Sequence, residues 1–249
     1  MTTSALVLAL AGTLGAGLAL RAPEPATTPP PALAPARIQP TTLAPARTPI
    51  RHVATRDPAV AITFDACAIK TNGYGFDAAV FDILKREQVP ATIFVSGRWV
   101  EFHPDAMAEL VRDPLVEFGD HSYDHPHMSR LPAAGMADEI DRTEAALGHY
   151  GKRSVAFRPP FGEWSGRLVD VARAKGLPLV TWDVVSGDPS KRTTTAGMIR
   201  AVLDKTRPGS IVIFHINGRG RKTAEALPAI LTGLRQRGYH FVQLSELLK

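Results

Sequence analysis

Short apolar runs recur along the chain from about residue 51 to its end. Each run is only a few residues long and is bounded by polar or turn-forming residues, which is typical of buried β-strands. The predicted strands are residues 59–64, 91–95, 115–118, 155–157, 179–182, 211–214 and 241–244.

Most segments between these runs carry apolar residues at helical spacing. Residues 76–86 illustrate it, because Phe76, Val80 and Leu84 fall on one face of a helix. The other predicted helices are residues 105–112, 133–150, 166–175, 194–206 and 224–237. Strands that alternate with helices indicate parallel βα units, so we expect an α/β fold. Since no linker interrupts the segment, one barrel-like sheet of about seven strands fits better than two domains.

The first residues follow another pattern. Residues 5–20 are almost uninterrupted apolar sequence, and about sixteen residues suit the core of a signal peptide better than a membrane span. However, no Lys or Arg precedes this run and Arg21 follows it, which reverses the usual charge bias. We therefore interpret residues 1–21 as a cleaved signal peptide, an uncleaved N-terminal membrane anchor or a misplaced start. The first two predict an exported protein that is periplasmic, extracellular or anchored facing outside.

A proline-rich segment follows. Residues 22–50 contain nine of the 21 prolines of the chain, mixed with Ala and Thr. Such a composition cannot build a core and favours an extended, semi-rigid spacer. We therefore predict a linker at 22–50 and a globular domain at 51–249.

Charge and cysteine content narrow the classes of partner. The formal net charge of +5 over 249 residues is modest, and it does not indicate the clustered Lys and Arg of a nucleic-acid-binding surface. Cys67 is the single cysteine, which excludes an intrachain disulfide and a zinc site with several cysteines.

Polar residues stand at the ends of five predicted strands. Two of them, His121 and His125, are four residues apart, so one helical turn would place both imidazoles on one face as a half-site for Zn²⁺ or a similar ion. The alternative for this pair is a polar turn with hydrogen-bonded histidines. Because the carboxyl ends of parallel strands carry the chemistry of such folds, the whole set predicts an active-site rim. Its members are Asp65, His121, His125, Arg158, Asp183 with Asp188 close behind, and His215.

These motifs resemble the polysaccharide deacetylases of carbohydrate esterase family four, which share the NodB-type deacetylase domain. The resemblance covers roughly residues 59–248. Its signatures occur in order as Thr63-Phe64-Asp65, His121-Ser122-x-x-His125, Arg158-Pro159-Pro160-Phe161-Gly162, Trp182-Asp183 and the run that ends in His215. The resemblance implies a distorted (β/α) barrel of seven strands and metal-dependent removal of acetyl groups from carbohydrate.

The resemblance also implies roles for individual residues. Asp65 would be the general base that activates water, and Arg158 would keep it ionised and oriented. His215 would protonate the leaving amine, with Asp183 as its partner. A carboxylate base and an imidazole acid divide the proton transfers of such a hydrolysis.

The metal set departs from the family pattern. His121 and His125 would be ligands of a divalent metal, expected to be zinc, but the family's usual second Asp is replaced by Ala66 in Thr-Phe-Asp-Ala-Cys. We expect Asp65 to serve as the third ligand. Asp77, a thiolate of Cys67, or a site without catalytic metal remain as alternatives.

The sequence therefore predicts a hydrolase that acts on non-peptide carbon–nitrogen bonds. It would remove acetyl groups, from nitrogen or from oxygen, from a cell-envelope or extracellular glycan. Two alternatives stay open: a non-catalytic glycan-binding domain on the same fold, and a metal-independent amide hydrolase. Residues 217–223 form either a basic lid or a flexible loop, while Phe161, Trp164 and Trp182 either stack on sugar rings or pack in the core.

Overall fold

We describe a computed structural model of the chain, which covers residues 47–68 and 74–249. The predicted signal peptide or anchor at 1–21 and nearly all of the predicted linker at 22–50 lie outside these residues. Within the described part, no helix has the length and apolar character needed to cross a membrane. The globular domain includes Ile50, one residue before its predicted start. The Ile50 N–H donates to the Leu179 carbonyl (2.9 Å), and the Ile50 carbonyl accepts from Thr181 N (2.8 Å).

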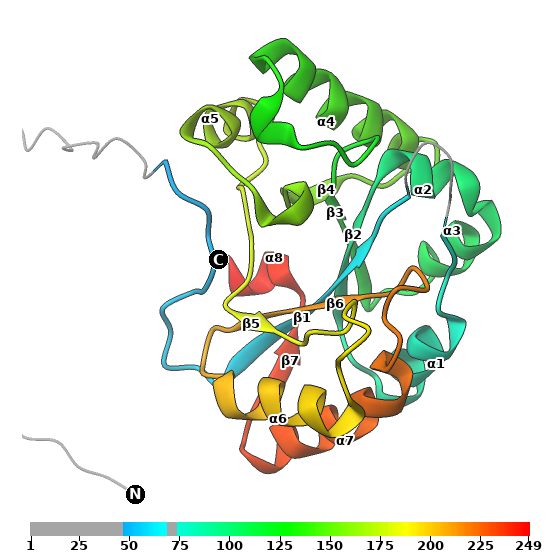
Figure 1. Ribbon diagram of the computed structural model, residues 1–249, viewed down its shortest axis with the longest axis vertical. Coiled ribbons are helices and arrows are strands. Elements are labelled where there is room, and N and C mark those ends of the chain that lie inside the picture. The colour runs from blue at the N-terminus through cyan, green and yellow to red at the C-terminus, as the bar shows by residue number, and fades with distance from the viewer. Residues whose placement is uncertain (1–46, 69–73) are drawn as a thin grey trace, which may run out of the picture. The chain divides into compact units, whose positions relative to one another are not determined.

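The centre of the domain is a seven-stranded sheet in which every pair of strands is parallel (Figure 1). The strands are β1 (Ala59–Ala66), β2 (Ala91–Val95), β3 (Val116–Asp120), β4 (Ser154–Phe157), β5 (Val184–Val185), β6 (Ile211–His215) and β7 (His240–Val242). Their order is β4-β3-β2-β1-β6-β5, and β7 pairs with the first half of β1. The predicted α/β fold with one parallel sheet is therefore confirmed.

The predicted strand at 179–182 is wrong in its position. Its residues make only isolated bridges, Phe157 to Leu179 and Ile50 to Val180, and the regular strand is β5 further along. The reason is that the segment changes partner: it begins beside β4 and then pairs with β6 through Val184 and Val185. This change of partner connects the two edges of the sheet, as a distorted barrel requires.

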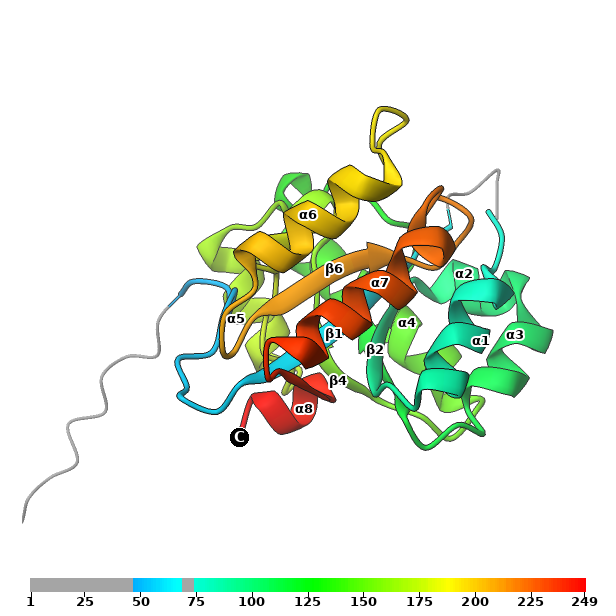
Figure 2. The same ribbon diagram turned by 90° about the horizontal axis from the view of Figure 1, so that it is seen from below.

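Helices surround the strands, with α6 and α7 on one side and α4 and α5 on the opposite side (Figures 1 and 2). The helices are α1 (Ala78–Glu87), α2 (Gly97–Phe102), α3 (Pro104–Leu110), α4 (Ala133–Gly148), α5 (Gly166–Ala174), α6 (Thr195–Lys205), α7 (Thr223–Gln236) and α8 (Leu244–Leu247). All six predicted helices are present. The two that were missed, α2 and α8, are too short to show a periodic pattern.

Alternation along β1 decides which residues face the site. Val60, Ile62, Phe64 and Ala66 all belong to the large apolar cluster that packs against the helices. Ala59 and Ala61 belong to a second cluster on the other face of the strand. Because successive side chains of a strand point to opposite faces, Thr63 and Asp65 follow the second face, toward the inside of the ring of strands.

Close packing around Phe94 generates a first prediction. A Cβ on Gly119 of β3 would lie 2.3 Å from the Phe94 ring, so Gly119→Ala must displace that ring. We expect the free energy of unfolding to fall by about 1–3 kcal/mol, as is usual for overpacking. Denaturant titration measures it. Gly148→Ala is the matched control, since a Cβ there meets nothing within 4 Å, and an equal effect of both changes would contradict the prediction.

Candidate active site

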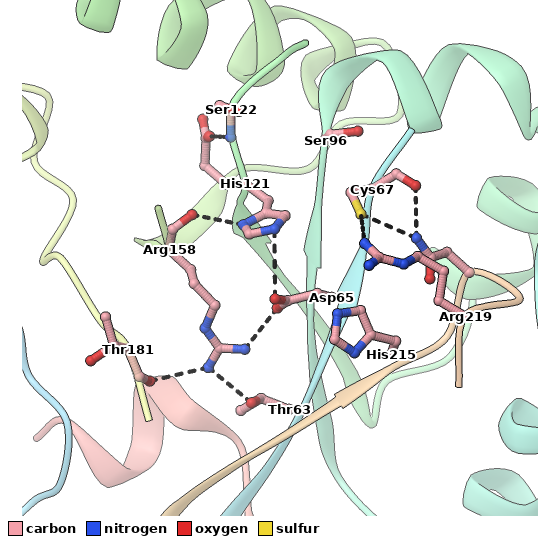
Figure 3. Close-up of polar contacts among 12 residues, drawn as sticks. Thr63, Asp65, Cys67, Ser96, His121, Ser122, Arg158, Thr181, His215 and Arg219 are labelled. Carbon is pink, nitrogen blue, oxygen red and sulfur yellow. Dashed lines mark hydrogen bonds and ion pairs between the residues drawn. The ribbon is translucent and has the colours of Figure 1, made fainter. Parts of the chain in front are cut away.

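The carboxyl ends of β1, β3, β4 and β6 converge on one pocket, and Figure 3 shows one side chain from each: Asp65, His121, Arg158 and His215. Five residues of the predicted rim line this pocket: Asp65, His121, His125, Asp188 and His215. The pocket is lined by Asp65, His121, His125, Phe161, Trp182, Val185, Asp188, His215, Arg219 and their neighbours. The predicted rim at the strand ends is thus present as a physical cavity.

An ion pair between Asp65 and Arg158 forms the buried base of the site. Arg158 is fully buried, and its Nη1 donates to Asp65 Oδ1 at 2.8 Å. Its Nη2 donates to Thr63 Oγ1 (2.9 Å) and to the Thr181 carbonyl (3.3 Å), and its guanidinium lies 3.9 Å from the Phe94 ring centroid.

The same surroundings set the protonation of Asp65. Burial alone would raise the pKa of its carboxyl group. The imidazoles of His121 and His215 in their protonated forms, together with the charge and the hydrogen bond of Arg158, bring the pKa below its usual value. Asp65 is therefore held as a carboxylate, with Oδ1 engaged by Arg158 and Oδ2 directed toward His121 (3.6 Å from Nε2).

The two histidines after β3 are neutral and close together. The rings of His121 and His125 meet edge to face with centroids 4.9 Å apart. Burial lowers the pKa of both imidazoles, that of His125 to about 3, and the charge of His121 adds to the effect on His125. His121 Nδ1 donates to the Arg158 carbonyl at 2.7 Å, which leaves Nε2 as its free nitrogen. A neutral imidazole oriented through its other nitrogen is the usual form of a metal-ligating histidine.

A loop, not a helical turn, brings these histidines together. Ser122 and His125 both adopt a left-handed backbone, with φ of 63° and 56°. The loop is anchored by buried carboxylates: Asp120 Oδ1 accepts from Ser122 N at 2.7 Å, and Glu139 Oε2 accepts from Tyr123 N (2.9 Å) and Asp124 N (2.8 Å). Sequence reasoning missed both anchors, although Glu139 gave a signal as an acid on the apolar face of α4.

His215 is held by a different residue from the one predicted. Its Nδ1 donates to Asp188 Oδ1 at 2.8 Å, and Asp188 Oδ2 accepts from the backbone of His215 (2.5 Å) and from Thr223 Oγ1 (2.9 Å). Asp188 is 1% exposed. Burial together with three donors makes it a rigid carboxylate partner for the imidazole.

The predicted pairing of Asp183 with His215 is therefore wrong. Asp183 Oδ1 accepts from Ile211 N at 2.8 Å, and its Oδ2 accepts from Ser210 Oγ (3.0 Å) and Arg207 Nε (3.4 Å). Ile211 begins β6 and His215 ends it, so the two lie about 13 Å apart at the strand rise of about 3.3 Å per residue. Asp183 therefore holds the start of β6. The acid that contacts His215 at the end of β6 is Asp188, which follows β5.

The residues near the two histidines include Cys67 as well as the expected third ligand Asp65. In the described residues, the group of ligand atoms that all lie within 4.8 Å of one another belongs to Cys67, His121 and His125. Asp65 is not in this group, although its Oδ2 lies 3.6 Å from His121 Nε2. Asp77, the other carboxylate considered, accepts a hydrogen bond from Gly218 N (3.0 Å). Two buried imidazoles and a thiol are a donor set that suits Zn²⁺.

Two aromatic residues, Phe161 and Trp182, line the pocket. Phe161 and Trp164 are among the exposed large apolar side chains, at 55% and 43%. The Phe161 ring stacks on His127 at 4.4 Å, and His127 in turn pairs with Glu163 at 2.9 Å. Trp182 is half-buried and lies 5.6 Å from the Arg158 guanidinium, so it packs beneath the site more than it faces solvent.

The anchor of the histidine loop generates a second prediction. Glu139→Ala leaves the backbone N–H groups of Tyr123 and Asp124 without their acceptor. A buried donor left unsatisfied costs about 1–3 kcal/mol, so we expect a fall of this size in the free energy of unfolding, measured by denaturant titration. Glu139→Gln keeps one side-chain oxygen and is the control. If both variants were as stable as the wild-type protein, Glu139 would not hold this loop.

Comparison with known proteins agrees with this geometry. Residues 52–180, which are 129 of the 249 residues, match the family model described as polysaccharide deacetylase. Among curated proteins, the chain is 31% identical over 167 residues to the uncharacterized protein YlxY of Bacillus subtilis, covering 67% of this chain and 51% of that protein. It is 28% identical over 204 residues to the peptidoglycan-N-acetylmuramic acid deacetylase PdaA of Bacillus subtilis, covering 78% of this chain and 73% of PdaA.

A solved structure of an inactive relative is also similar. The wild-type BA3943 protein of Bacillus anthracis, described as a CE4 family pseudoenzyme, matches with a TM-score of 0.73 and 28% identity over 82% of this chain and 70% of that one. A mutant of BA3943 with restored enzymatic activity matches equally well, with a TM-score of 0.72. The chain spans about half the length of YlxY. By its fold, its matched family model and its site, the chain belongs to the polysaccharide deacetylase family, carbohydrate esterase family four.

Proposed function

We propose that this protein is a metal-dependent hydrolase that removes acetyl groups, from nitrogen or from oxygen, from a cell-envelope or extracellular polysaccharide. One observation carries the proposal. A carboxylate fixed by a buried guanidinium, Asp65 with Arg158, lies beside two neutral imidazoles and shares its pocket with a histidine held by a buried carboxylate, His215 with Asp188.

The proposed reaction divides the proton transfers between Asp65 and His215. Asp65 accepts the proton of a water molecule through the oxygen that Arg158 does not engage, and the water oxygen forms a bond to the acetyl carbonyl carbon. His215 Nδ1 is held by Asp188, so Nε2 donates the proton to the leaving nitrogen as the carbon–nitrogen bond breaks. The products are acetate and a free amine.

A divalent ion held by this site would supply the remaining chemistry, since such an ion would polarise the carbonyl group and make water more acidic. His121 and His125 are the two residues proposed to hold it. The rest of the pocket suits a sugar, since the exposed ring of Phe161 offers a flat apolar face at its mouth. The similarity to a peptidoglycan deacetylase supports an N-acetylated envelope glycan as the substrate, and the apolar N-terminal segment supports export.

A non-catalytic glycan-binding domain is the second candidate. Ala66 in place of the usual metal-binding Asp favours it, as does the similarity to a CE4 family pseudoenzyme. Against it stand the two buried pairs, Asp65–Arg158 and Asp188–His215. A protein that only binds a glycan gains nothing from a buried base and acid, each of which must be desolvated.

Metal removal gives the third prediction. The full chain is incubated with chitin oligosaccharides, peptidoglycan or an acetylated exopolysaccharide, and released acetate is measured. We expect release to vanish after chelation and to return on addition of Zn²⁺ or Co²⁺. Release that is indifferent to chelation would indicate a metal-independent amide hydrolase. Binding without any release, by a folded protein, would indicate the glycan-binding domain.

The observed partner of His215, Asp188, and the expected one, Asp183, give the fourth prediction. Asp188→Asn removes the charge that orients the His215 imidazole, and we expect kcat for acetate release to fall about 100-fold or more. Asp183→Asn is the matched control: it acts at the start of β6, so kcat should stay near the wild-type value while the free energy of unfolding falls by about 1 kcal/mol. Equal losses of kcat in both variants would contradict the assignment of Asp188.

A further inference from the structure

Position 66 faces the apolar core, and position 67 faces the site. Ala66 is fully buried in the same cluster as Phe64 and Ala68. Since side chains alternate along the chain at the end of β1, Cys67 follows the face of Asp65. The sulfur accordingly comes within 4.8 Å of ligand nitrogens on both His121 and His125.

Two hydrogen-bond donors are directed at the sulfur of Cys67, although burial and the charge of Asp65 raise the pKa of the free thiol. Asn217 is fully buried, and its Nδ2 donates both to Cys67 Sγ (3.2 Å) and to the Cys67 carbonyl oxygen (2.8 Å). Arg219 Nη1 lies 3.9 Å from the sulfur on the same side (Figure 3). Two donors directed at one sulfur orient it, and such outer partners are typical of metal ligands.

The nitrogens of the histidines complete the set. His121 Nδ1 is occupied by the Arg158 carbonyl, so its Nε2 is available. The edge-to-face arrangement of the His121 and His125 rings keeps both imidazoles next to Cys67 without a hydrogen bond between them. Arg158 engages Oδ1 of Asp65, and Asp65 does not belong to the group of ligand atoms around Cys67.

We propose that Cys67 is the third protein ligand of a Cys-His-His metal site with His121 and His125, which leaves Asp65 free as the base. The proposal rests on the proposed function and names the ligands of the same site. Cys67 releases its thiol proton to solvent when the cation binds, since metal-bound thiols are deprotonated. Two imidazoles and a thiolate would suit zinc, and a thiolate favours Zn²⁺ or Co²⁺ over Mg²⁺ and Mn²⁺.

Cobalt reports the ligand directly. The full chain is stripped of metal and titrated with Co²⁺, and the absorption spectrum and the bound metal are measured together. A sulfur ligand gives an intense near-ultraviolet charge-transfer band, whereas oxygen and nitrogen ligands give only weak visible bands. We expect one Co²⁺ per chain, with that band and with the strong visible absorption of a four-coordinate site.

Three variants make the assignment specific. Cys67→Ser should remove the charge-transfer band. It should also weaken metal binding by more than about 100-fold, because the loss of a residue that only supports a ligand typically weakens binding by about 10- to 100-fold. Cys67→Asp should remove the band yet still bind metal, because a carboxylate then replaces the thiolate. Asp65→Asn, which keeps an oxygen for Arg158, should retain both band and affinity but release no acetate.

The outcomes separate this proposal from the proposed function. Co²⁺ binding without the band in the wild-type chain overturns Cys67 as a ligand, even if a metal still restores acetate release. If Asp65→Asn does not bind Co²⁺ and the wild-type chain lacks the charge-transfer band, the proposal is overturned, and Asp65 is the third ligand instead. The band without acetate release on any substrate supports the ligand assignment while the proposed function fails. The wild-type spectrum alone decides the question if the Cys67 variants do not fold.

Discussion

The buried pair of Arg158 and Asp65 is the interaction on which the rest of the site depends. A guanidinium that is fully removed from water must be paired and hydrogen-bonded, because leaving such a charge unpaired costs about 3–5 kcal/mol. The two terminal nitrogens of Arg158 bind Asp65, the Thr63 hydroxyl and the Thr181 carbonyl, and the Phe94 ring covers the face of the guanidinium, while Nε has no hydrogen-bond partner. These partners come from β1, β2 and the segment before β5. The ion pair therefore fixes the strands around it relative to one another.

The same residue links the base to the proposed metal ligands. The side chain of Arg158 orients Asp65, and its main-chain carbonyl accepts from His121 Nδ1. One residue at the end of β4 thus sets the direction of the carboxylate and the tautomer of the imidazole. His215 is held independently, by Asp188. The site accordingly consists of two rigid pairs built by different strands, which meet only at the pocket.

Periodicity predicted the fold and the strand ends well, because both follow from which residues are apolar and how they alternate. The runs that became β1, β2, β3 and β6 are buried throughout or nearly so, and Asp65, His121, His125, Arg158 and His215 stand where those strands and β4 end. The segment 179–185 was harder to predict, since it divides its pairing between two neighbours. Asp183 was misassigned for a related reason. The pattern shows that an acid follows a strand, but only the register shows which end of the neighbouring strand it reaches.

The first motif shows the same limit at the scale of one residue. By motif comparison, Ala66 occupies the place of a metal-binding carboxylate, and its methyl group cannot bind a cation. In the fold, however, Ala66 packs among the apolar residues behind β1, and the donor atom at the pocket is the Cys67 sulfur. A one-residue change of position along a strand reverses the side to which a side chain points, so the Ala66 methyl group and the Cys67 sulfur lie on opposite faces. Ala66 alone is therefore weak evidence for a site without metal, and the buried Asn217 beside the sulfur is evidence that this position is organised around Cys67.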